Sequence, residues 1–255
     1  MSASRAFLRK EVLENIRNYK LFILFTVFAL IGVTSPLSAK FLPELLSRLT
    51  DENITMIIEH PTYVDSWLQF YSNVNQNGLV VLLLVFSPIM SKEYEKGTLV
   101  HMVTKGLPRL SIYMGKLILL FSSWTLLYWL SALITLIYTN YYFPKSSLEG
   151  VLIATVSMYL FGLMLMALLL SVAVILRTSF GTLLTVGAFV GLLYLGELFP
   201  LIQKWSPLQL NSRNVEWLAG KEIGRELIQS FAVTGLLILL FIGIGAVFFR
   251  RKTIN

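Results

Sequence analysis

Side chains able to carry out catalysis or bind metals are scarce in this chain of 255 residues. It has no cysteine, so thiolate catalysis, disulfide bonds and sulfur-liganded zinc sites are excluded. Its two histidines, His60 and His101, are too few for a histidine metal cluster, and no GxSxG or HExxH motif is present. We therefore predict that this chain has no catalytic residue, no metal ligand and no bound cofactor.

The sequence also lacks a phosphate-binding loop. A loop that cradles ATP follows the pattern GxxxxGK[ST], and that pattern does not occur here. Any function driven by nucleotide hydrolysis therefore needs ATP and Mg²⁺ on a partner chain. Ion- or proton-coupled transport is disfavoured as well, because Glu197 is the only ionisable residue in the long apolar segments.

A charged loop at residues 92–116 holds the most informative polar pattern. The sequence around it reads SKEYEKGTLVHMVTKGLPR. Thr98 suits a helix N-cap, Gly106 suits a left-handed C-cap, and Pro108 blocks continuation of a helix. These signals predict a short helix of about two turns, parallel to the membrane, between charged flanks.

The predicted helix has an apolar edge formed by Leu99, Met102 and Val103, spaced at i, i+3 and i+4. Such an edge suits a groove on a soluble partner. Alternatively, it packs against the membrane helices of its own chain. The pattern alone leaves both alternatives open.

Together with Lys10-Glu11 near the N-terminus and with Lys116, this loop resembles the membrane subunits of type-2 ABC transporters, most of which are exporters. In that family the loop after the second span forms a coupling helix that contacts a separate ATP-binding subunit. The N-terminal helix lies along the inner membrane surface, and the last outer segment dips back into the bilayer. The resemblance implies coupling roles here for Glu93, Glu95, Gly97, Thr98 and Arg109.

The resemblance implies a permease subunit that forms a translocation pathway for an amphipathic or hydrophobic cargo, such as a peptide, an antibiotic or a lipid. Its expected partners are a soluble ABC ATPase, which carries ATP and Mg²⁺, and a second copy or a similar permease chain. Two other classes remain as alternatives. One is a non-transporting membrane immunity or binding protein, and the other is a membrane-embedded enzyme.

The elements that must position these residues are membrane helices. Hydrophobic residues make up 56% of the chain and charged residues 14%, against about 25% charged residues in soluble domains. A spanning helix needs about 20 mostly apolar residues. We predict an all-α integral membrane protein with six spans, at residues 21–39, 67–91, 117–138, 151–175, 181–198 and 230–249, within a membrane domain at 21–249.

The distribution of basic residues predicts the orientation in the cell membrane. If the N-terminus is cytoplasmic, the inner segments hold 14 Lys and Arg residues and the outer segments hold 7. Cytoplasmic loops carry an excess of Lys and Arg, so both termini, including the basic tail at 250–255, are expected inside. The positive charge is then explained by sidedness and attraction to membrane lipids, and no nucleic-acid partner is expected.

The N-terminal segment, residues 1–20, is predicted to form an amphipathic helix at the inner membrane surface. Its expected apolar side is Leu8, Val12, Ile16 and Tyr19, and its charged residues include Lys10, Glu11, Glu14 and Arg17. After the first span, residues 41–49 suggest a separate short helix on the outer surface, with Pro43 in its first turn.

The second span carries a polar pattern of its own. Gln69, Asn73, Gln76 and Asn77 are spaced at i, i+4, i+7 and i+8, on one face of a regular helix. They are predicted to line a polar translocation path or, alternatively, to form hydrogen bonds between helices.

Overall fold

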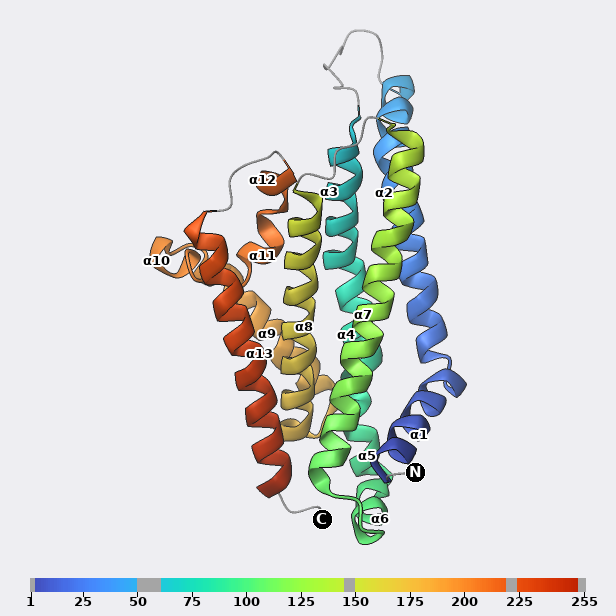
Figure 1. Cartoon of the computed structure of the whole chain (residues 1–255), viewed down its shortest axis with the longest axis vertical. Coiled ribbons are helices and arrows are strands. Elements are labelled where there is room, and N and C mark those ends of the chain that lie inside the picture. Colours follow the sequence, from blue (N-terminus) through green and yellow to red (C-terminus); the bar gives the residue numbers. More distant parts are fainter. Residues whose placement is uncertain (1–2, 50–60, 145–149, 219–223, 252–255) are drawn as a thin grey trace.

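The computed structural model describes residues 3–49, 61–144, 150–218 and 224–251, and within these ranges every regular element is a helix (Figure 1). His60, part of the predicted outer loop and the end of the basic tail lie outside the described residues. Six helices are long and apolar enough to cross a membrane, which confirms the predicted all-α, multi-pass class. The candidate spans are Lys20–Leu42, Tyr63–Glu95, Arg109–Tyr142, Val151–Leu176, Ser179–Gly196 and Leu227–Arg251.

Most of the spans coincide with single long helices. These are α2 (Lys20–Leu49), α7 (Arg109–Tyr142), α8 (Val151–Leu176), α9 (Ser179–Gly196) and α13 (Arg225–Arg251). Helix α7 has 34 residues, so at 1.5 Å per residue it is about 51 Å long and exceeds the hydrocarbon thickness of about 30 Å. It therefore connects the two ends of the bundle.

Helix α2 corrects one prediction. The separate surface helix expected at residues 41–49 is absent, because α2 runs without interruption from Lys20 to Leu49. The residues that join the two parts, Ser38-Ala-Lys40, include no glycine or turn signal that would end a helix. Here Pro43 lies inside a longer helix instead of in a first helical turn.

The second span is composite. It consists of α3 (Tyr63–Asn73), the π-helical turn η1 (Val74–Gly78), α4 (Leu79–Phe86), the 3₁₀ turn η2 (Ser87–Ile89) and α5 (Ser91–Glu95). Pro88 departs from helical geometry, with φ −85° and ψ 17°, which bends the chain before α5. The span thus begins earlier and ends later than the predicted residues 67–91.

Helix α8 lies at the centre of the bundle, in contact with α7, α9 and α13, and α2 packs along α7 (Figure 1). A close approach between α7 and α8 depends on Gly162. A Cβ atom at that position would overlap the ring of Trp124. The indole nitrogen of Trp124 donates a hydrogen bond of 2.9 Å to the Tyr159 carbonyl, which holds the ring in place.

The two ends of the bundle differ. Helices α1 (Ala3–Arg17), α5 and α6 (Thr98–Thr104) gather at the end where the first and last described residues lie, which we call the termini end (Figure 1). Toward the other end, three short helices lead from α9 to α13. They are α10 (Pro200–Gln203), α11 (Gln209–Ser212) and α12 (Asn214–Leu218).

Candidate functional site

The segment between the second and third spans folds as α5 and α6, joined by a tight turn. Gly97 takes a left-handed conformation in this turn, with φ +62°, and directly precedes α6. Gly106 is also left-handed, with φ +86°, and follows the end of α6, as the sequence predicts. A two-turn helix therefore lies where we expected one, bounded by two glycines that the positive φ angles favour.

The prediction that Thr98 caps this helix was wrong. Gly97 holds the N-cap position, and Thr98 is the first residue of α6. The Thr98 hydroxyl instead donates a hydrogen bond back to the carboxylate of Glu93 in α5. Because the glycine provides the turn into the helix, the threonine side chain is available to tie α6 to α5.

The apolar edge of α6 turns toward the membrane helices. Leu99 is fully buried, and Met102 and Val103 are half-buried against the same core. Within the single chain the edge therefore packs on its own bundle, which was one of the two alternatives. The face of α6 that stays exposed carries Val100, His101 and Thr104, and any partner of this helix would contact that face.

Four charged side chains from three helices meet next to α6, and we call Lys10, Glu11, Glu93 and Lys116 the charge cluster. The Lys116 ammonium, on α7, lies 3.1 Å from Oε2 of Glu11 on α1 and 3.2 Å from Oε1 of Glu93 on α5. The Lys10 ammonium lies 3.2 Å from Oε1 of Glu11 and 3.5 Å from Oε1 of Glu93. The cluster therefore joins α1, α5 and α7 by ion pairs.

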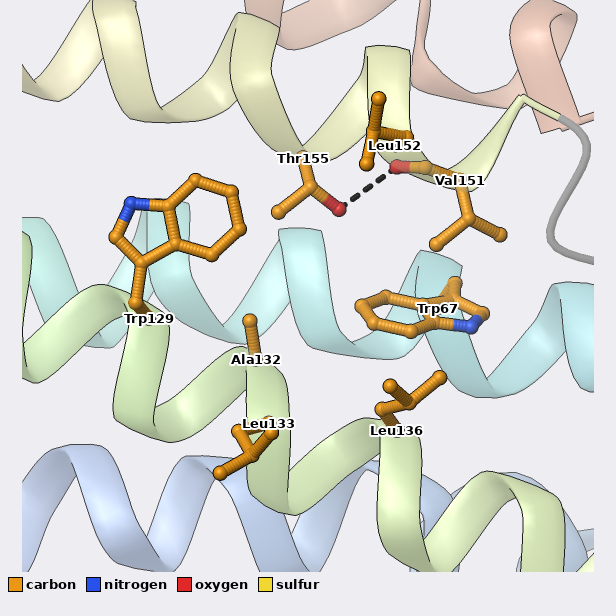
Figure 2. Close-up of a pocket in the computed structure, with 8 residues that line it drawn as sticks. All are labelled: Trp67, Trp129, Ala132, Leu133, Leu136, Val151, Leu152 and Thr155. Atoms are coloured by element: carbon orange, nitrogen blue, oxygen red, sulfur yellow. Dashed lines mark hydrogen bonds between the residues drawn. The ribbon is translucent and has the colours of Figure 1, made fainter.

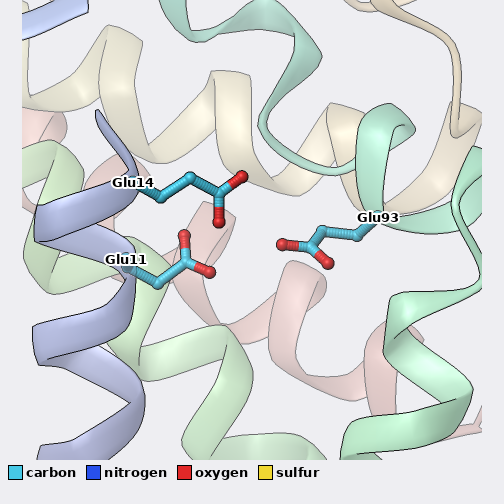
Figure 3. A group of neighbouring side chains, drawn as sticks. All are labelled: Glu11, Glu14 and Glu93. Atoms are coloured by element: carbon cyan, nitrogen blue, oxygen red, sulfur yellow. The ribbon is translucent and has the colours of Figure 1, made fainter. Parts of the chain in front are cut away.

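A third carboxylate extends the cluster. Glu14 pairs with Lys10 at 2.8 Å, and Figure 3 shows the carboxylates of Glu11, Glu14 and Glu93 turned toward one another. Their oxygens lie within 4.8 Å, a spacing that a metal ion could use. The ammonium groups of Lys10 and Lys116 already lie against these carboxylates, however, so the arrangement is a satisfied ion-pair network.

Burial makes this network costly to break. Lys116 is 1% exposed, Glu11 3% and Glu93 7%. Burial opposes the charge of Lys10, but its hydrogen bond to Glu14 and the nearby charges of Glu11 and Glu93 outweigh that effect and raise the pKa of Lys10 above its ordinary value. Removing one partner would leave the charge of the other buried and uncompensated, which typically costs about 3–5 kcal/mol.

Helix α1 contacts the rest of the bundle through Phe7, Glu11 and Asn15, which are buried at i, i+4 and i+8. Of the side expected to face the membrane surface, Leu8 and Val12 are half-buried, and Ile16 and Tyr19 are 53% and 69% exposed. Glu11 turns inward because its partner, Lys116, lies on α7. Helical spacing within the segment does not reveal such a distant pairing.

The remaining residues of the predicted coupling set lie outside the cluster. Arg109, at the start of α7, donates a hydrogen bond of 3.2 Å to the Arg250 carbonyl at the end of α13. Glu95 is exposed. Tyr94, between Glu93 and Glu95, lies under the guanidinium of Arg177, which is 4.4 Å from the ring centre. The turn between α8 and α9 thereby contacts α5.

The structure divides the polar residues of the second span into two groups. Gln69 and Asn73 are half-buried, and the Asn73 amide donates a hydrogen bond of 3.0 Å to Ser35 on α2. Gln76 and Asn77 are exposed. The π-helical turn at Val74–Gly78 holds an extra residue, so the two groups do not share one face as they would in a regular helix.

A cavity of about 210 Å³ lies between α3, α7 and α8, toward the end of the bundle away from the termini. In Figure 2 the rings of Trp67 and Trp129 flank this space. The Thr155 hydroxyl, its main polar side-chain group, is engaged with the Val151 carbonyl at 2.7 Å. This cavity suits apolar groups and offers no ionisable side chain. Its remaining lining residues are Ala132, Leu133, Leu136 and Leu152.

Sequence reasoning missed both the charge cluster and the apolar cavity as sites. Lys116 carried a usable signal, because it is a cation directly before a long apolar segment that begins at residue 117. The cavity carried none, because its residues come from three separate helices. Comparisons of the chain with protein-family models, with curated proteins and with solved structures found no match.

Proposed function

We propose that this chain is the membrane permease subunit of an ATP-driven exporter of the type-2 ABC class, with α6 as its coupling helix. The observation that carries the proposal is the charge cluster. Its buried ion pairs join α1, α5 and α7 at the termini end of the six-helix bundle, and the Thr98 hydroxyl of the partly exposed α6 is hydrogen-bonded to its Glu93. A helix held by these contacts is suited to transmit a displacement from a soluble partner to the membrane helices.

The contacts of α6 lead from its exposed face to the membrane helices. A push on its exposed face moves Thr98, whose hydroxyl is bonded to Glu93, and Glu93 is paired with Lys116 on α7. Because separating buried charges is costly, α7 moves together with α5 and α6 instead of slipping past them. Helix α7 then carries the motion from Lys116 to its far end at Tyr142, about 39 Å away at 1.5 Å per residue.

The proposal also includes the orientation of the chain in the membrane. The termini end contains the basic segments of the chain, so we place it in the cytoplasm by the positive-inside rule, where a soluble ATPase is accessible. The partner supplies ATP and Mg²⁺, since this chain has no phosphate-binding loop.

A second permease chain is expected to complete the pathway. Gln76 and Asn77 are exposed polar side chains within a membrane span. Polar groups at such depth usually face a protein partner or a water-filled path instead of lipid. We therefore assign them to the pathway, for an amphipathic or hydrophobic cargo.

Co-purification in mild detergent tests the coupling role. Wild-type chain is expected to retain an ATPase that hydrolyses Mg-ATP, and Val100→Asp on the exposed face of α6 is expected to lose it. Ala6→Asp is the matched control, because Ala6 is also exposed on a helix at the termini end. It should retain the ATPase.

Two results would contradict the proposal. If the Val100→Asp variant retained the ATPase, α6 would not be part of the docking surface. If the wild-type chain transported cargo in vesicles that hold no nucleotide-hydrolysing partner, it would not be a subunit of an ATP-driven exporter.

A further inference from the structure

A second cavity, of about 440 Å³, lies where α1 bends into α2. The bend is made by Asn18 and Tyr19, and Tyr19 takes a left-handed conformation with φ +56°. The volume of this cavity falls within the range of about 300–1,000 Å³ that is typical of ligand pockets. We call it the elbow pocket, and it is lined by Lys10, Leu13, Glu14, Arg17, Asn18 and Lys96.

The lining of the elbow pocket has surplus positive charge. It contains three cations and one carboxylate, and that carboxylate, Glu14, is already paired with Lys10 at 2.8 Å. Arg17 and Lys96 are exposed and make no ion pair with any carboxylate among the described residues. Their two charges are therefore available to an anion, and they approach the pocket from α1 and from the turn after α5.

An apolar rim adjoins these charges. The rim consists of Leu13, which lines the pocket, and Ile16, which directly precedes Arg17 in the chain; both side chains are exposed. A free anion in water would gain nothing from such a rim. An amphiphile with an anionic headgroup and acyl chains matches both features, because the headgroup meets the cations and the chains cover the apolar side chains.

We propose that the elbow pocket binds the phosphate headgroup of an acidic phospholipid. Arg17 and Lys96 contact the phosphate, and the apolar rim lies against the acyl chains. Arg17 suits this role because a guanidinium can donate two parallel hydrogen bonds to phosphate oxygens. The bound lipid joins α1 to the α5–α6 turn beside the charge cluster, with which the pocket shares Lys10.

The test is a lipid titration of the purified full-length chain in detergent micelles, with bound lipid counted by native mass spectrometry. Phosphatidylglycerol is expected to bind more tightly than phosphatidylcholine to the wild type. The double variant Arg17→Gln with Lys96→Gln is expected to bind phosphatidylglycerol about thirtyfold more weakly, since each basic side chain near a membrane surface contributes about fivefold.

The matched control is Lys105→Gln with Arg251→Gln, which removes two exposed cations of the termini end that do not line the pocket. It should bind like the wild type. An equal loss of phosphatidylglycerol binding in both double variants would overturn the proposal, because it would show general attraction of the lipid to the positive surface. So would a wild type that does not distinguish the two lipids.

Two further measurements keep the test decisive. Inorganic phosphate is added alone, and if it displaces the lipid at equal concentration, the pocket is an anion site and the lipid assignment is wrong. Circular dichroism checks that each variant keeps its helical content. If the double variant loses it, the single variants Arg17→Gln and Lys96→Gln are titrated instead, each with about a fivefold expected loss.

Discussion

Helices α8 and α9 follow one another in the chain, are both free of charged residues and are both strongly apolar, yet they occupy different environments. In the most apolar stretch of α8, 72% of the residues are buried, whereas the corresponding value for α9 is 11%. Helix α8 is surrounded by α7, α9 and α13, and α9 lies at the edge of the bundle. Helix α13 has the same mean hydropathy as α8 in its most apolar stretch, yet only 17% of that stretch is buried, so apolar composition alone does not distinguish the central helix from a peripheral one.

The physical reason is that lipid chains are as apolar as leucine side chains. A leucine side chain has a similar free energy inside the bundle and against the lipid chains, so helix association depends on close packing and on hydrogen bonds. Glycines show the difference directly. Gly162 of α8 lies against the Trp124 ring, whereas a Cβ atom added at Gly187 or Gly191 of α9 would meet no other atom within 4 Å.

The largest expected effect is that of truncating a buried leucine. Leu169 of α8 is fully buried, so Leu169→Ala should lower the free energy of unfolding by about 2–5 kcal/mol, through loss of packing and the cavity left behind. Leu192 of α9 is 66% exposed, so Leu192→Ala is the control and should change it little. Unfolding in detergent by sodium dodecyl sulfate measures both, and equal losses would mean that α9 is packed as tightly as α8.

Replacing glycine by alanine, which adds one methyl group, is expected to change the free energy of unfolding in opposite directions in α8 and α9. Gly162→Ala forces a Cβ atom into the Trp124 ring and should destabilise the protein by about 1–3 kcal/mol. Gly187→Ala meets open space and should stabilise the monomer by up to about 1 kcal/mol, because alanine favours helix more than glycine does. Thermal unfolding of the monodisperse monomer compares the two. A stable Gly162→Ala variant would contradict the tight contact between α7 and α8.

The smallest effect concerns hydrogen bonds between helices. The Thr155 hydroxyl of α8 lies 3.0 Å from the Tyr71 hydroxyl of α3, so Thr155→Val should cost about 0.6–1.7 kcal/mol. Thr185 of α9 is exposed, and Thr185→Val should have almost no effect. The same detergent unfolding assay measures both. A double-mutant cycle with Tyr71→Phe assigns the loss to this pair, and additive losses would show that the pair is not coupled.

The candidate site was predictable only in part. Glycine and proline signals located α6, because Gly97 and Gly106 act on backbone conformation within a few residues. The roles of Thr98 and Leu99 were harder to predict. Whether Thr98 caps its helix or bonds to Glu93, and whether Leu99 faces a partner or its own bundle, depends on what lies across the contact.

The charge cluster shows the same limit over a longer range. Glu11 and Lys116 are 105 residues apart, and each by itself resembles an ordinary interfacial charge. In the second span, the π-helical turn at Val74–Gly78 changed which polar residues share a face, and the polar residues around it give no sign of the extra residue in their spacing.

The sequence by itself determined that the chain is a helical membrane protein, how many spans it has and approximately where each begins and ends. These properties are sums over neighbouring residues, since about 20 apolar residues in a row suffice to cross the bilayer whatever surrounds them. Only the tertiary structure decided that α8 is central and α9 peripheral, that Glu11 faces Lys116, and that α6 turns Leu99 inward. Each of these is a contact between segments far apart in the chain, and its energy depends on both partners at once.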